Sequence, residues 1–225
     1  MNFDKFFRQY EDVVQQVAST FKKVQDEYDE CVKCKVGCAD CCHALFDLTL
    51  IEALYIKTRF DAVYHGEEKE ALLERANKAD RLIHKLKRDA YKEYEAGRSE
   101  IEILEEMSAK RVRCPLLNDE EQCDLYAYRP ITCRLYGVPT QIGEKAHCCL
   151  LSGFEPGRSY PTVKIDQIHR RLYQISAELA REIRSRYPDL AEMLVPLSMA
   201  LLTDYTEEYL GVRPEQAPDA SKASE

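Results

Sequence analysis

Apolar residues recur at steps of three and four along most of this chain. From Phe3 to Tyr28 the spacing predicts an amphipathic helix over 2–30. The same spacing predicts a long charged helix over 68–95 and another helix over 165–183. These three segments alone make a mainly helical protein the first expectation.

Capping signals place the starts of two further helices. Thr49 and Glu52 match the capping-box pattern Thr-x-x-Glu and predict a helix over 50–60. Ser99 and Glu102 form a second such pattern, which predicts the start of the next helix.

Glycine and proline positions complete the expected fold. Gly97 is expected to end the long helix as a left-handed cap, and Pro196 is expected to kink a last helix over 189–210. No stretch alternates with a period of two, so no strand is predicted. The predicted fold class is all-α, a helical bundle with an irregular cysteine-rich region that binds metal.

The segment 114–161 differs from the rest of the chain. It holds five of the nine prolines, four of the eight glycines and half of the ten cysteines, a composition typical of loops. We expect a single helical domain over 1–211, with its cysteine core at about 31–150. The tail over 212–225 is rich in Pro, Ala, Ser and Glu and is predicted to be disordered.

Composition and charge narrow the class of protein. The formal net charge of −8 argues against nucleic-acid binding, which usually needs a basic patch. The longest apolar stretch, around 194–202, contains Pro196 and is shorter than the ~20 residues that span a membrane. The first residues contain no apolar signal region, so we expect a cytoplasmic protein with no membrane partner.

Ten cysteines in a reducing compartment require an explanation other than disulfides. Cysteines that serve only as small buried hydrophobes would be scattered, whereas these fall into two clusters, over 31–42 and 114–149. The clustering predicts a metal centre, either zinc or an iron–sulfur cluster.

The spacings match neither of two common metal motifs. The first cluster lacks the long separation of a zinc ribbon, and its spacers are permuted relative to the ferredoxin pattern. It reads Cys31-x2-Cys34-x3-Cys38-x2-Cys41-Cys42. Adjacent side chains usually diverge, so Cys41 and Cys42 are predicted to serve two metals or one larger cluster.

The cysteine pattern resembles the family named for its CxxCxxCC signature and described as a zinc- or iron-chelating domain. The resemblance covers about half of the chain, and here the first spacer is one residue longer than in the family name. It rests on Cys34-x3-Cys38-x2-Cys41-Cys42, Leu48-Thr49-x-x-Glu52, Cys114-Pro-Leu-Leu, Cys123 with Leu125-Tyr126, Arg129-Pro130-x-x-Cys133-Arg134, and a late cysteine, Cys148 or Cys149.

The resemblance implies eight metal ligands. They are Cys34, Cys38, Cys41, Cys42, Cys114, Cys123, Cys133 and Cys148. Cys31 and Cys149 are additions to the pattern. A flagellin lysine methylase with similar clusters, thought to carry an iron–sulfur centre, is the nearest functional analogy.

Other residues near the clusters admit two readings each. His43 and His147 are either surface residues or additional ligands. Arg129 and Arg134 are either in exposed salt bridges or positioned to offset thiolate charge. The tyrosines are expected to pack around the site; they are Tyr126, Tyr128 and Tyr136.

The spacing Cys34-x3-Cys38-x2-Cys41 also matches the radical S-adenosylmethionine motif. That chemistry normally needs a β/α barrel and a glycine-rich cofactor strand, neither of which the sequence contains.

The sequence therefore predicts a metal-binding protein with a structural or redox role. Two alternatives stay open. One is an iron–sulfur-dependent enzyme, either a modifier resembling a protein lysine methylase or an oxidoreductase. The other is a metal-stabilised interaction module that binds a protein partner on its helical surface. The sequence does not decide whether the protein is an enzyme.

Overall fold

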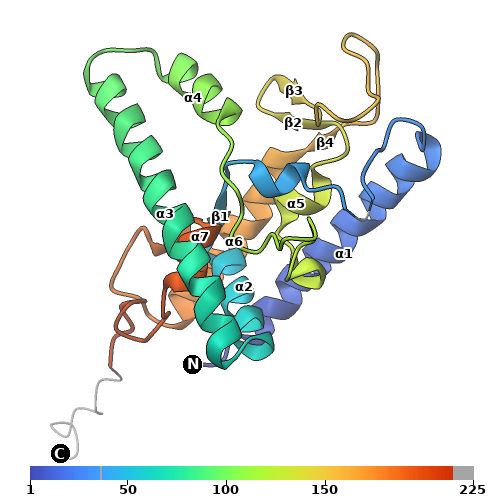
Figure 1. Cartoon of the computed structure of the whole chain (residues 1–225). Coiled ribbons are helices and arrows are strands. Elements are labelled where there is room, and N and C mark those ends of the chain that lie inside the picture. The colour runs from blue at the N-terminus through green and yellow to red at the C-terminus, as the bar shows by residue number, and fades with distance from the viewer. Residues whose placement is uncertain (36, 215–225) are drawn as a thin grey trace, which may run out of the picture.

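The computed structural model describes residues 1–35 and 37–214. Within these ranges the fold is mainly helical, as predicted (Figure 1). The α-helices are α1 (Asp4–Glu27), α2 (Leu50–Val63), α3 (Gly66–Glu95), α4 (Glu100–Ala109), α5 (Ile131–Leu135), α6 (Ile165–Glu182) and α7 (Leu197–Leu202). The strands are β1 (Asp47–Thr49), β2 (Thr140–Ile142), β3 (Lys145–His147), β4 (Val163–Lys164) and β5 (Leu194–Pro196).

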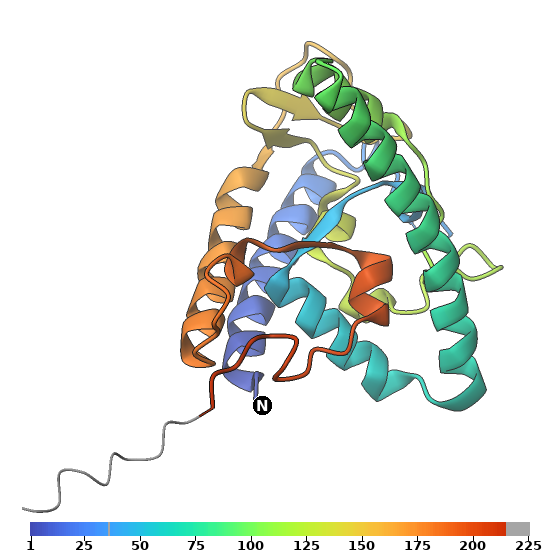
Figure 2. The same ribbon diagram turned by 90° about the vertical axis from the view of Figure 1, so that its left-hand side faces the viewer.

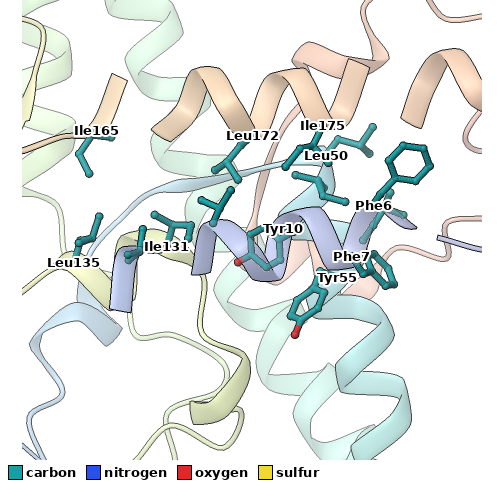
Figure 3. Close-up of a cluster of buried hydrophobic side chains, with 14 of the residues drawn as sticks. Phe6, Phe7, Tyr10, Leu50, Tyr55, Ile131, Leu135, Ile165, Leu172 and Ile175 are labelled. Atoms are coloured by element: carbon teal, nitrogen blue, oxygen red, sulfur yellow. The ribbon is translucent and has the colours of Figure 1, made fainter. Parts of the chain in front are cut away.

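Helix α2 lies at the centre and is buried along most of its length. One side packs against α1, α5 and α6, where Leu50 and Tyr55 meet Tyr10 and Leu172 (Figure 3). Its other side packs against α3 and α7 in a second cluster that includes Phe60. Because both sides are buried, α2 joins the two halves of the core.

The helices lie in a layered arrangement around α2. In Figure 2, α1 and α6 lie side by side along one edge, and α3 runs along the opposite edge. The strands β3, β2 and β4 form a small sheet near one end of α6, and β1 pairs with β5 in antiparallel register. The irregular chain between α4 and α6 lies between these two edges, where the cysteines gather.

Most of the predicted helices are confirmed. α1, α2, α3 and α6 lie over 4–27, 50–63, 66–95 and 165–182. The predicted capping box of α2 is present, and Gly97 follows α3 with a φ of +90°. The helix that the second capping pattern predicts is also present, because α4 begins at Glu100 directly after its N-cap Ser99. The capping hydrogen bonds are not formed, and the carboxylate of Glu102 lies 3.7 Å from Arg98 instead.

The predicted last helix over 189–210 is wrong. Leu190–Glu192 form a 3-10 turn, Leu194–Pro196 form β5, and the α-helix is limited to Leu197–Leu202. Proline has no backbone N–H and fixes its φ angle, so Pro196 starts α7 as its N-cap instead of kinking a longer helix. The prediction of no strands is also wrong. Strands of two or three residues are too short to show the alternation of apolar and polar residues that identifies a strand.

None of the described helices is long and apolar enough to cross a membrane.

The tail that the sequence predicts to be disordered is described only as far as residue 214. Val212, within it, pairs with Ser185 in an isolated bridge, and 215–225 lie outside the described residues.

Candidate metal centre

Backbone pairing brings the two cysteine clusters together. Cys41 and Cys42 lie on a short 3-10 helix, Asp40–His43. The N–H of Cys114 donates to the carbonyl of Cys42 at 2.7 Å, and the N–H of Val112 donates to that of His43 at 3.0 Å. Cys114 is therefore held directly beside the first cluster, across the intervening helices α2, α3 and α4.

Cys133 is fixed by the core through α5. Ile131 and Leu135, on the same short helix, are buried in the main apolar cluster. The Ile131 N–H donates to the buried carboxylate of Glu52 at 3.1 Å. A helix of five residues has little stability of its own, so these contacts decide where Cys133 lies.

Cys123 is held by a loop that is tied to α2 and α3. Its neighbour Asp124 pairs with Arg75 at 2.9 Å, and the hydroxyl of Tyr64, just after α2, donates to the Asp124 carbonyl at 2.6 Å. An isolated bridge also joins Cys123 to Leu117. The loop is therefore anchored at both of its ends.

Cys34 and Cys149 line one cavity together with Cys41. A Cβ atom built on Gly137 would lie 2.1 Å from the Cys34 sulfur, so only glycine permits this close approach. The Cys149 thiol donates to the Asp40 carboxylate at 3.3 Å, and Asp40 is paired with Arg111. Cys149 is thus joined to the first cluster by its hydrogen bond to Asp40, the residue before Cys41.

Three adjoining cavities are lined by these cysteines, and Cys41 lines all three. The smallest cavity, about 50 Å³, lies against the apolar side chains of α2, α3 and α7, and the other two are about 250 and 340 Å³. The cysteines that line at least one of them are Cys34, Cys38, Cys41, Cys42, Cys114, Cys123, Cys133 and Cys149.

The thiols influence one another's ionisation. Hydrogen bonds from the thiols of Cys133 and then Cys42 hold the pKa of Cys41 well below its usual range. The hydrogen bond between Cys133 and Cys41 raises the pKa of Cys133. Burial raises the pKa of Cys34 to about 11 and the pKa of Cys114 to about 12. Cys41 is therefore the thiol that ionises first.

Cys41 and Cys42 share two of the three cavities, and Cys41 without Cys42 lines the third, together with Cys34. That the two cysteines serve two metals or one larger cluster stays a prediction.

The thiols are not gathered around a single point. Within residues 1–35 and 37–214, no group of three or more His, Cys, Asp or Glu side chains is arranged to hold a metal ion. All ten cysteines are free thiols.

The remaining sequence candidates are distributed as follows. Cys148, the eighth ligand implied by the resemblance, is exposed and lines none of the three cavities, whereas its neighbour Cys149 does. The His43 ring contacts the Ala39 carbonyl at 3.1 Å, and His147 is exposed on β3. Sequence reasoning treated Cys149 as an addition, because adjacent cysteines cannot be told apart by spacing.

The two arginines have different surroundings. Arg134 donates to the carbonyls of Ala127 and Arg129 at 2.6 and 2.7 Å, so it stabilises the loop before α5. The guanidinium carbon of Arg129 lies over the Tyr126 ring, 3.7 Å from the ring centre, and Arg129 lines all three cavities. Within residues 1–35 and 37–214, neither forms the exposed salt bridge that is one of the two interpretations from the sequence.

Comparisons with known proteins add no family. No family model, no curated protein and no solved structure matches this chain.

Proposed function

We propose that this protein binds metal, as zinc or as an iron–sulfur cluster, through thiolates from both cysteine clusters. The observation that supports the proposal is the meeting of eight cysteine side chains, from segments far apart in the sequence, around adjoining cavities. Thiolate sulfur is the preferred ligand of both centres.

The chemistry of the surroundings also favours metal over simple packing. The cysteines lie on loops and short helical turns, and ordering such segments costs conformational entropy. A metal that cross-links them would contribute its binding free energy to folding.

Binding requires local rearrangement. The thiols lie around shared cavities without converging on one point, so some must rotate about their single side-chain torsion when metal binds. The low pKa of Cys41 makes it the natural first ligand, because a thiolate binds metal and a thiol does not.

The donor set favours a structural or electron-transfer role. A site in which thiolates fill every ligand position has no open position for Lewis-acid chemistry. We take Cys149, in place of Cys148, as the eighth ligand, because Cys149 lines a cavity with Cys34 and Cys38.

Adjacent cysteines give a matched pair of variants to test this proposal. Cys149→Ser and Cys148→Ser make the same chemical change one residue apart. We expect Cys149→Ser to lower the metal content per chain, and we expect Cys148→Ser to retain the wild-type content. Metal analysis of anaerobically purified protein, with circular dichroism as a check on folding, measures both.

The opposite result would revise the ligand set. Loss of metal in Cys148→Ser alone would restore the ligand implied by the family resemblance. Full metal content in both variants would remove this segment from the centre, and absence of metal in the wild type would contradict the proposal itself.

A further inference from the structure

The cavity of about 340 Å³ between α1 and the cysteine loops has an unusual charge. Apart from the thiols, every charged side chain that lines it is a cation, in a protein whose net charge is −8. These cations are Lys22, Lys35, Arg129 and Arg134. Phe21, Ala18 and Tyr126 add apolar and aromatic surface. We call this cavity the cationic cleft.

Arg129 is the cation whose hydrogen-bond donors are free. Among residues 1–35 and 37–214, its guanidinium makes no hydrogen bond and no ion pair, and its Nε is buried without a partner. Stacking on Tyr126 holds the group in one plane, so its donors are preorganised. A buried donor without a partner is costly, and such groups often await a ligand.

The described carboxylates near the cleft do not pair with Arg129, whose ionisable neighbours include the thiols of the cleft. Arg134 directs its donors to backbone carbonyls, and Lys22 pairs with Asp26 on exposed α1 surface. Asp40 is the carboxylate beside Cys149, and it is paired with Arg111. Lys35 is exposed at the cleft and has no ion pair within the described part of the chain.

We propose that the cationic cleft binds a small organic anion, whose carboxylate or phosphate group is held by Arg129 and Lys35. The planar guanidinium fork matches the paired oxygens of both groups, and the volume lies in the range of small-molecule sites, roughly 300–1,000 Å³. The body of the ligand would lie against Phe21 and Ala18. This inference goes beyond the proposed function and places an organic ligand beside the thiols.

A competing explanation is that Arg129 only offsets the charge of metal-bound thiolates. The two explanations predict different behaviour. A ligand anchor determines the affinity for added anions, whereas a counter-charge determines how well the protein retains metal. Both quantities can be measured on the same samples.

The test is calorimetric titration of the full chain with succinate and with inorganic phosphate, beside metal analysis of each preparation. We expect saturable binding of at least one probe to the wild type, and about tenfold weaker binding to Arg129→Gln, since a charge-assisted contact is lost. Arg129→Lys, which keeps the charge and loses the fork, is expected to bind weakly too. Arg81→Gln, an exposed arginine on α3, is the matched control and should bind as the wild type does.

The two probes separate a carboxylate from a phosphate ligand. No binding of either probe to metal-containing wild type would overturn the anion site and leave the metal proposal intact. Equal affinities in Arg129→Gln and Arg81→Gln would also overturn it, as would loss of metal in Arg129→Gln with unchanged anion affinity. Anion binding that depends on Arg129 in protein without metal would support the cleft and contradict the metal proposal.

Discussion

Glu52 is the residue that links the core to the cysteines. It is 3% exposed, and one carboxylate oxygen accepts from the Thr49 N–H and hydroxyl at 3.1 and 3.0 Å. The other oxygen accepts from the N–H of Ile131 at 3.1 Å. One side chain therefore caps α2 and also holds the start of α5, the helix that carries Cys133.

Replacing Glu52 by Gln should destabilise the protein by about 1–3 kcal/mol, because the amide nitrogen cannot accept and one buried N–H loses its partner. Urea unfolding at neutral pH measures the loss. Glu70→Gln, at an exposed position of α3, is the control and should change stability by less than about 0.5 kcal/mol. Equal stabilities of the two variants would show that Glu52 does not hold α5.

Burial also raises the pKa of Glu52 above its usual value. The folded state then binds this proton more tightly than the unfolded state does. The resulting stability is present below the unfolded pKa, about 4.3, and is lost as the pH rises through the folded pKa. The stability difference between wild type and Glu52→Gln should therefore be larger near pH 4 than at pH 7.

Residue-level prediction succeeded where the signal is local. The capping box of Thr49 and Glu52 could be predicted because its partners lie three residues apart. The second role of Glu52 could not, because Ile131 is distant in sequence and only the packing of α5 brings it close. For the same reason, the sequence could not choose between Cys148 and Cys149.

Among the described helices, α2 has the most buried residues. Its two sides meet different apolar clusters, and its buried residues include Phe60, which is fully buried. An element buried on both sides has no polar face, so its sequence shows little helical periodicity. The capping box, more than the apolar spacing, is what identified it.

Phe60→Ala should cost about 3–5 kcal/mol, since it leaves a cavity between α2 and α3. Val63, at the end of the same helix, is 46% exposed, and Val63→Ala should change stability by less than about 0.5 kcal/mol. Thermal or urea unfolding of both variants measures the contrast. A small cost for Phe60→Ala would mean that the second cluster contributes little to folding.

The amphipathic helices could be predicted from sequence, and the short elements could not. α1 and α6 each bury one face, so their apolar residues repeat with the helical period. The pair β1 and β5 depends on contact between segments that are far apart in sequence. Pro196 fits either a kinked helix or the start of a new one, and only the pairing of Leu194 and Val195 with β1 decides.

In the whole molecule, the helices form a frame around the irregular cysteine segments. α1 and α6 make up one side of this frame, α3 and α7 make up the other, and α2 lies between them. Backbone pairing of Cys42 with Cys114 joins the first loop to the second, across the helices between them. A metal bound there would close a long stretch of chain, and closing long loops is where a cross-link stabilises most in principle.

Metal binding is tested most simply by the content of zinc, iron and acid-labile sulfide per chain in anaerobically purified protein. We expect either iron with matching sulfide or zinc without sulfide, together with loss of stability when a chelator removes the metal. Iron with sulfide would favour a redox role, and zinc would favour a structural one. A folded protein that contains neither metal would rule out the proposed metal centre.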